Sequence, residues 1–283
     1  MPKKNVSQED IVGRWSVAKL DLLKKYLAAY VNILSKQSWC KGYEYIDAFA
    51  GAGKAKTREE QKYVDGSPRI ALGLKPSFTR YHFIEQSDWR ISQLQKLRVE
   101  YSERNIAVYQ GDCNKVLTEQ ILPQLSRASN KRAIAFIDPY GMDVEWETIK
   151  ALAKAGTVEI LLNFPTMAIN RGILRQRPEA ISQENKDRMA RFWGTGDWMA
   201  DIYKEEQTLF EIERIKIRDS GIELGNRFKK RLRELFPHCT TPVLMTNSKN
   251  APLYCIMFAG HNITGAKIAR DIFERYLKLR MGS

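Results

Sequence analysis

The first segment with a clear hydrophobic pattern covers residues 12–35. Leucine and valine recur there at every third or fourth position, and the positions are Leu20, Leu23, Leu27, Val31 and Leu34. This spacing places the apolar side chains on one face and predicts an amphipathic helix. The next segment, YEYIDAF at 43–49, is a short apolar run followed by small residues and glycines. It predicts a buried strand.

From residue 80 to residue 164, apolar runs alternate with segments of helical character. The expected strands are 80–86, 105–111, 133–138 and 158–164, and the expected helices are about 88–101, 114–125 and 144–155. The run AIAFID at 133–138 is almost continuously apolar, which is typical of a central strand buried on both faces. Strand–helix alternation at this spacing predicts a parallel sheet with helices on both faces.

The alternation stops after residue 165. Residues 166–236 are highly charged and largely helical in character, and we expect no strand among them. Two apolar runs return at 241–247 and 252–260, joined by a turn-rich SKNA, and a helix is expected over about 264–279. The two runs predict an antiparallel hairpin at the sheet edge. We therefore expect an α/β core formed by 1–165 and 237–283, with a helical insertion at 166–236 between the fifth and sixth strands.

Composition and charge narrow the class of protein. A hydrophobic share of 43% and a charged share of 28% are ordinary for a globular protein. No stretch approaches the roughly 20 apolar residues of a membrane span, and the N-terminus lacks the apolar segment of a secretory signal. We expect a cytoplasmic protein without a membrane association. The four cysteines are far apart and form no C-x-x-C motif, so we expect no metal site.

The charge balance points to a polyanionic partner. The chain has 46 Lys and Arg against 33 Asp and Glu, a formal net charge of +13. Such an excess favours binding to DNA or RNA, because each neutralised phosphate releases counterions. A basic protein without such a partner has the same composition, so charge by itself leaves both interpretations open.

Glycines and acids gather where the predicted strands end. Ligands bind at the carboxyl ends of the strands in open α/β sheets. The first strand leads into DAFAGAG at 47–53, whose glycines let the backbone pass close to a ligand or simply form a tight turn. The next strands end at Glu85, Asp112 and Asp138. Glu85 can accept hydrogen bonds from ribose hydroxyls and Asp112 from an adenine amino group. Asp112 and Asp138 can instead cap the helices that follow.

Several of these segments resemble class I S-adenosylmethionine-dependent methyltransferases and, more narrowly, the bacterial three-Cys-motif partner proteins. The matching segments are YIDAFAGAG, DGSPRIAL, FIEQSDWR, FIDPYG and FAGHNITGAKIARDI. The resemblance implies a Rossmann-like, mostly parallel sheet with an antiparallel last strand, S-adenosylmethionine as cofactor and a partner protein encoded nearby. It implies that the cofactor is lined by Lys19, Asp47, Phe49, Ala50, Gly51, Gly53, Ser67, Glu85, Gln86, Asp112 and Cys113. The alternative interpretation of Lys19 is an ordinary surface lysine. The alternative interpretation of Ser67 is a helix N-cap before Pro68.

The segment Asp138-Pro139-Tyr140 indicates what kind of substrate is methylated. It resembles the [D/N/S]-P-P-[Y/F] motif of methyltransferases that act on adenine N6 or cytosine N4. By this resemblance, Asp138 and the Pro139 carbonyl accept hydrogen bonds from the target amine and Tyr140 stacks on the base. The second proline of the motif is absent, so Tyr140 stands one position early. Asn163, at the end of the fifth predicted strand, is a second candidate for holding the amine.

The insertion supplies candidate contacts to nucleic acid. Trp193 can stack on an exposed base or pack the insertion against the core. The run RFKKRLR at 227–233, with Lys229, Lys230 and Arg231, can follow phosphates or form a solvated helix face. We expect a methyltransferase of DNA or RNA, with the insertion as lid or target-recognition element. The alternatives are a partner-dependent or non-catalytic cofactor-binding module, and a methyltransferase of a protein or small molecule.

Overall fold

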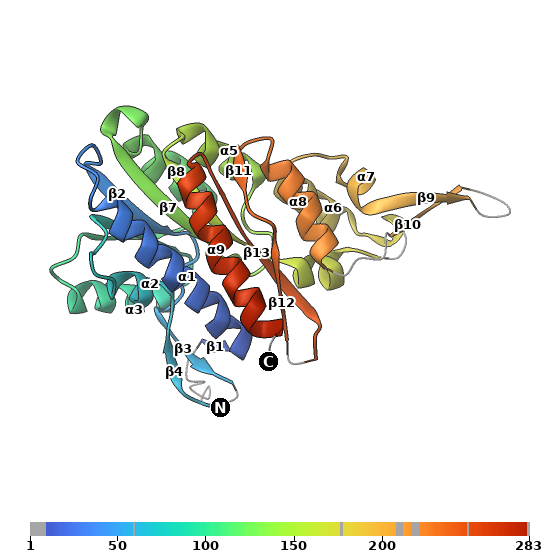
Figure 1. Cartoon of the computed structure of the whole chain (residues 1–283). Helices are drawn as coiled ribbons and strands as arrows, with labels where there is room; N and C mark the ends of the chain where they lie inside the picture. The colour runs from blue at the N-terminus through green and yellow to red at the C-terminus, as the bar shows by residue number, and fades with distance from the viewer. Residues whose placement is uncertain are drawn as a thin grey trace.

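A mixed eight-stranded sheet forms the centre of the protein in a computed structural model (Figure 1). The structure describes residues 10–58, 60–175, 178–207, 212–216, 221–247 and 249–281. Across the sheet, the strands are β6 (Ile106–Gln110), β5 (Arg80–Glu85), β2 (Gly42–Asp47), β7 (Lys131–Ile137), β8 (Val158–Phe164) and β13 (Pro252–Gly260). Two short strands, β11 (His238–Cys239) and β12 (Val243–Thr246), both pair with β13.

The strand order makes this a Rossmann-like sheet. Strands β6, β5, β2, β7 and β8 run parallel, whereas β13 runs antiparallel to β8. The chain starts in the middle at β2, adds β5 and β6 on one side, and then crosses to β7 and β8 on the other. The point between β2 and β7 is therefore the topological switch, where such sheets bind ligands. The predicted fold is confirmed, including the antiparallel last strand and the edge hairpin of β12 and β13.

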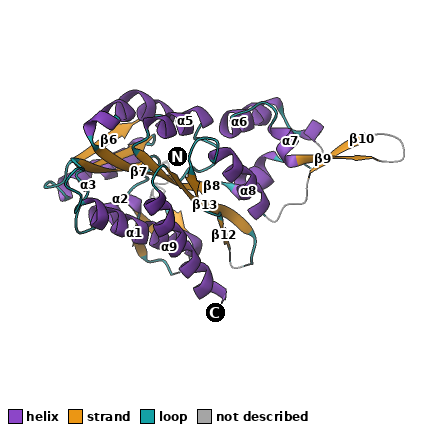
Figure 2. Ribbon diagram, turned by 45° about the horizontal axis from the view of Figure 1, so that its top comes forward, coloured by secondary structure: helices purple, strands orange, loops and turns teal. Residues whose placement is uncertain are grey.

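Helices cover both faces of the sheet (Figure 2). One face packs against α1 (Arg14–Leu34), α2 (Ser67–Leu72), α3 (Asp88–Glu100) and α9 (Ile263–Met281). The other packs against α5 (Trp146–Ala155), α6 (Gln183–Trp193) and α8 (Ile222–Leu232). Tyr45 and Ile46 are neighbours on β2 but belong to opposite hydrophobic clusters, because successive strand residues point to opposite faces.

Shorter helical segments complete the two layers. The helix expected at 114–125 is α4 (Cys113–Lys115), continued by a π-helical turn (Val116–Ile121) and a 3₁₀ turn (Leu122–Gln124). The others are Arg127–Ser129, Ala168–Ile173, Pro178–Ala180 and α7 (Trp198–Ile202). No helix in the described part of the chain is both long enough and apolar enough to span a membrane.

The insertion departs from expectation in one respect. Its strands β9 (Tyr203–Gln207) and β10 (Ile212–Lys216) form an antiparallel hairpin that projects from the body (Figure 1). The prediction that 166–236 contains no strand is therefore wrong. The segment is rich in glutamate and lysine, which favour helices when considered alone. Pairing between the two strands outweighs that local preference. Helix propensity is a property of single residues, so it contains no information about the pairing.

A second small sheet was also missed. Strand β3 (Lys54–Thr57) pairs with β4 (Tyr63–Asp65) and with β1 (Ile11–Val12). This sheet brings Asp10 back over the loop that follows β2, where Oδ2 of Asp10 accepts a hydrogen bond from the backbone amide of Ala52 at 3.4 Å. Three short strands without alternation of apolar residues leave little signal in the sequence.

Candidate active site

A cavity of about 510 Å³ lies at the topological switch, where β2, β5 and β6 end. Its volume is in the range of small-molecule and cofactor sites. The predicted site residues that line it are Phe49, Glu85, Gln86, Asp112, Cys113 and Tyr140. The structure thus brings together residues from four strand ends, as the parallel arrangement predicts.

The loop after β2 requires its glycines. Gly51 and Gly53 have φ angles of +64° and +76°, a left-handed conformation that side chains disfavour. A Cβ on Gly66 would lie 3.1 Å from the backbone of Gly53, and the Gly66 amide donates to the Gly53 carbonyl at 2.9 Å. Ala50 is buried behind this loop and its amide donates to the carbonyl of Ile84. The loop is therefore anchored to both β5 and α2.

Glu85 connects the glycine loop to the turn after β5. Its Oε2 accepts from the Gly51 amide at 3.0 Å, and its Oε1 accepts from the amides of Gln86 and Ser87 at 2.9 and 3.0 Å. Arg90 Nη1 lies 3.7 Å from Oε2. A carboxylate offers about four acceptor positions, so the backbone leaves part of this capacity for a ligand in the cavity.

Asp112 is a helix cap as well as a cavity residue. Its Oδ1 accepts from the amides of Asn114 and Lys115 at 2.8 and 3.2 Å, which caps α4. Oδ2 accepts no hydrogen bond from any described residue. The neighbouring thiol of Cys113 is buried, and burial raises its pKa well above the ordinary value. Cys113 is therefore a wall of the cavity and not a nucleophile.

Asp47 is fully buried at the end of β2. Its Oδ2 accepts from the hydroxyl of Tyr45 at 2.9 Å, and the side chain of Ser67 acts to lower the pKa of this carboxyl group. Oδ1 is buried without a partner. Burial, together with the nearby charge of Asp138, raises the pKa of Asp47 to about 7. The alternative interpretation of Ser67 as the N-cap of α2 is wrong, because the N-cap is Gly66 and Ser67 is the first residue of the helix.

Asp138 is held between two side chains from distant segments. Lys19 Nζ lies 2.5 Å from Oδ2, and the Asn163 amide nitrogen donates to Oδ1 at 2.6 Å. Lys19 is 8% exposed, and its ammonium lies 5.2 Å from the centre of the Tyr254 ring. The alternative of a surface lysine is therefore wrong. Oδ1 of Asn163 is buried and has no partner. Pro139 is buried beside this group.

Basic and aromatic side chains form the rim of the cavity. The exposed Tyr140 ring lies 4.9 Å from the guanidinium carbon of Arg90, which is itself ion-paired with Asp10 at 2.7 Å. Arg188 and Arg191 of α6 also line the cavity. They lie 3.8 Å from Asp143 and Glu145, surface ion pairs that contribute little to stability. We did not anticipate Arg90 and Arg188, although Arg90 stands in the FIEQSDWR segment.

Two predicted contacts to nucleic acid are not available as expected. Trp193 is fully buried, donates from Nε1 to Asp201 at 2.8 Å, and packs against Phe164 and Phe228. Of the two interpretations, packing of the insertion against the core is confirmed, and stacking on a base is wrong.

The basic run at 227–233 is also partly engaged within the protein. Arg231 is ion-paired with Glu234 at 2.9 Å and lies over the Trp146 ring. Lys229 Nζ lies 3.5 Å from the hydroxyl of Thr241. Lys230 is exposed. None of the three lysine and arginine residues predicted here lines the cavity.

No group of three or more metal-binding side chains occurs among the described residues. No protein-family model matches the chain, and no curated protein matches it. A protein of Legionella pneumophila with a solved structure is similar over 91% of this chain and 92% of its own length, with 14% identity and a TM-score of 0.54. This likeness shows the fold.

Two further solved structures are similar at lower scores. A putative methyltransferase of Escherichia coli has 13% identity and a TM-score of 0.35, over 84% of this chain and 87% of its own. A precorrin-6y C5,15-methyltransferase of Geobacter metallireducens has 13% identity and a TM-score of 0.30, over 82% and 86%. Likeness of this degree says nothing about function, so function has to be argued from the site itself.

Proposed function

We propose that the protein is an S-adenosylmethionine-dependent methyltransferase that acts on an exocyclic amine of a base in DNA or RNA. The observation that carries this proposal is the Asp138 group. A carboxylate at the end of β7 is held by Lys19 and Asn163, two residues before the Tyr140 that lines the cavity. Membership of the three-Cys-motif partner family is part of the proposal and is supported by the sequence segments quoted above.

The residues present fit the cofactor. S-adenosylmethionine has hydrogen-bond donors on its amino-acid end, its ribose and its adenine, and acids at the ends of β2, β5 and β6 offer acceptors to match. Oδ1 of Asp47 is a buried acceptor without a partner, which costs free energy unless a ligand or water donates to it. Asp47, Glu85 and Asp112 would hold these three parts of the cofactor. The backbone of the glycine loop would pass close to it. When bound, the cofactor supplies an electrophilic methyl group.

The chain's own residues would orient the target amine. An exocyclic amine has two N–H donors, and the site has two acceptors for them: the carboxylate of Asp138 and the unpartnered Oδ1 of Asn163. Lys19 and the Asn163 amide nitrogen fix the Asp138 carboxylate from opposite oxygens. Asp138 would also accept the proton that the amine loses on methylation. Catalysis of this kind is positioning together with stabilisation of developing charge.

The rim supports a nucleic-acid substrate. Tyr140 exposes 69% of its surface at the mouth of the cavity, where a base can stack on it. Arg90, Arg188 and Arg191 stand at the same rim, each paired with a carboxylate, in a chain whose net charge is +13. A base in a duplex would have to be flipped out to reach Asp138. Helix α6 of the insertion carries two of these arginines, which suits a role in target recognition.

Mass analysis of nucleosides tests the substrate class. DNA and RNA from cells with and without the gene should differ in one amino-methylated nucleoside, because the proposed acceptor is an exocyclic amine. Identical nucleoside profiles, together with intact cofactor binding by the purified protein, would favour the alternative of a cofactor-binding module that works with a partner protein.

A further inference from the structure

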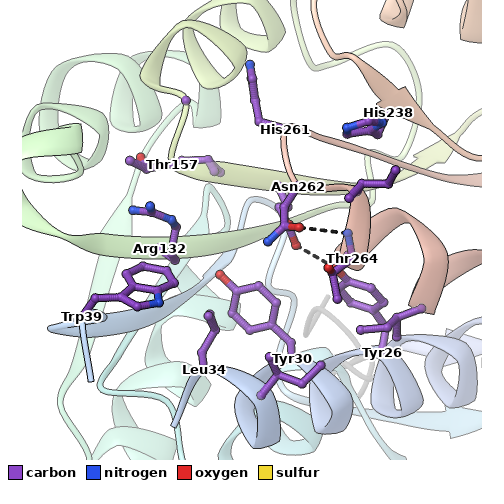
Figure 3. Close-up of a pocket in the computed structure, with 17 residues that line it drawn as sticks. Tyr26, Tyr30, Leu34, Trp39, Arg132, Thr157, His238, His261, Asn262 and Thr264 are labelled. Carbon is purple, nitrogen blue, oxygen red and sulfur yellow. Dashed lines mark hydrogen bonds between the residues drawn. The ribbon is translucent and has the colours of Figure 1, made fainter. Parts of the chain in front are cut away.

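A second cavity of about 460 Å³ lies at the opposite edge of the sheet (Figure 3). It is enclosed by α1, by the amino ends of β7 and β8, and by the first turn of α9. It shares no lining residue with the candidate active site. Glu159 in this cavity and Asn163 in the active site are four residues apart on β8, which separates them by about 13 Å. The two cavities are therefore distinct.

The acid of the second cavity is Glu159. Its Oε2 accepts a hydrogen bond from the Tyr26 hydroxyl at 2.7 Å. Its Oε1 accepts none from any described residue. Two glycines make room for this carboxylate: a Cβ on Gly265 would lie 2.6 Å from Oε1, and a Cβ on Gly260 would lie 3.1 Å from Cγ. Burial raises the pKa of Glu159 to about 7.

Two further polar atoms of the cavity lack partners. The Tyr30 hydroxyl is buried without a hydrogen bond, and the whole residue is only 7% exposed. Figure 3 shows the Tyr30 ring pointing into the cavity, between Arg132 and Asn262. Nδ1 of His261 is also buried without a partner. An unsatisfied buried polar group is unfavourable, so this cavity favours a ligand that bonds to it.

No described residue forms an ion pair with Glu159, although the charge of Arg132 lowers its pKa. The titratable groups that line the cavity with it are Tyr26, Tyr30, Arg132, His238 and His261. Arg132 lies over the Trp39 ring at 4.7 Å and donates to the carbonyl of Lys131, and it forms no ion pair with Glu159. Burial lowers the pKa of His261, which favours its neutral form. Glu159 therefore has a cation nearby in Arg132, but no described cation contacts its Oε1.

We propose that this cavity is a binding site for a small molecule with a protonated amine on an apolar or aromatic body. The amine donates to Oε1 of Glu159 and forms the ion pair that Arg132 does not form. The body packs against Ile33, Leu34 and Ile268, and the Tyr30 hydroxyl bonds to a polar group on it. This site is independent of the proposed methyl transfer and is tested without a methylation assay.

Three probes with the same body separate the possible chemistries. Tyramine has an amine, 4-hydroxyphenylacetate a carboxylate, and 4-ethylphenol neither. Calorimetry should show that tyramine binds at least about tenfold more tightly than the other two, because an ion pair formed out of water is worth more than about 1.4 kcal/mol. Glu159→Gln should remove this preference. Glu147→Gln, an exposed acid on α5, is the matched control and should leave it unchanged.

The dependence on pH gives a second readout that needs no variant. An ammonium binds the ionised carboxylate, so below pH 7 binding has to release a proton from Glu159. The affinity for tyramine should therefore rise between pH 6 and pH 8, by up to about tenfold per unit below the pKa. This measurement decides the matter if Glu159→Gln does not fold. The proposal is overturned if tyramine fails to bind in the millimolar range, if the carboxylate analogue binds more tightly, or if the amine preference survives in Glu159→Gln.

Discussion

The ammonium nitrogen of Lys19 lies 2.5 Å from a carboxylate oxygen of Asp138, although 119 residues separate them in the chain. Helix α1 is the element that makes this contact, because it packs against the sheet and points Lys19 toward the end of β7. The side chain of Tyr254 lies beneath the ammonium and bonds through its hydroxyl to the carbonyl of Trp15. The first helix therefore contributes a residue to the proposed active site and is not only a cover for the sheet.

Replacing Lys19 should impair turnover more than cofactor binding. Lys19→Met keeps the length of the chain but leaves Asp138 with one fixed oxygen, so we expect the methyl-transfer rate to fall by about tenfold or more and the free energy of unfolding by about 1–3 kcal/mol. Lys24→Met, an exposed lysine on the same helix, is the control. Equal rates for the two variants would show that the ion pair has no part in the reaction.

The raised pKa of Asp47 predicts a measurable pH dependence of stability. Unfolded aspartate has a pKa near 3.9, whereas burial raises that of Asp47 to about 7 in the fold. The folded state thus binds more protons, and the free energy of unfolding falls as pH rises between about 4 and 7. Asp47→Asn should remove this loss. The free energy of unfolding of the variant, relative to that of wild type, should therefore rise by about 2–3 kcal/mol from pH 5 to pH 7. Urea titrations at both pH values measure the difference, and a constant difference contradicts the assignment.

Glu85 should control cofactor affinity. Glu85→Gln retains the size of the side chain but removes the charge at the end of β5. The affinity for S-adenosylhomocysteine, measured by calorimetry, should fall by about ten- to a hundredfold, because a hydrogen bond to a charged group contributes about 1.5–3 kcal/mol. Glu100→Gln on α3, whose partner is Arg69, should have no effect. An unchanged affinity of Glu85→Gln for S-adenosylhomocysteine would contradict the proposal that Glu85 binds the ribose.

The arginines of α6 should account for part of the salt dependence of nucleic-acid binding. Replacing Arg188 and Arg191 with Gln should reduce the slope of log affinity against log salt by up to about two units on duplex DNA. Replacing Lys229 and Lys230 should reduce it by no more than about one, since only Lys230 is exposed. A larger effect from the α8 pair would place the phosphate path over α8 and away from the cavity.

The local pattern of apolar residues was sufficient to predict the central sheet. It was insufficient to predict contacts between distant segments of the chain. The runs that became β2, β5, β6, β7 and β8 are strongly apolar, and their order follows from short right-handed connections. Because parallel strands end at one edge, Glu85 and Asp112 were expected to meet in one site, and the structure confirms it. Strand ends are therefore the part of the site that sequence reasoning locates well.

The errors share a cause in tertiary packing. Trp193 was considered as a base-stacking residue, but the aromatic cluster around Phe228 buries it, and no local pattern reveals that cluster. The formation of β9 and β10 depends on pairing between two segments. The contact between Lys19 and Asp138 depends on how α1 crosses the sheet, which periodicity does not specify.

Transfer of a labelled methyl group from S-adenosylmethionine to nucleic acid by the purified protein tests the central claim most directly. Wild type should label an amino group in RNA or DNA. Asp138→Ala should lower that rate by roughly two to four orders of magnitude, the range for a positioned polar or acid–base group, while its affinity for S-adenosylhomocysteine stays within several-fold of wild type. A folded wild type that binds the cofactor but labels neither nucleic acid, or an Asp138→Ala variant that labels as fast as wild type, would contradict the account.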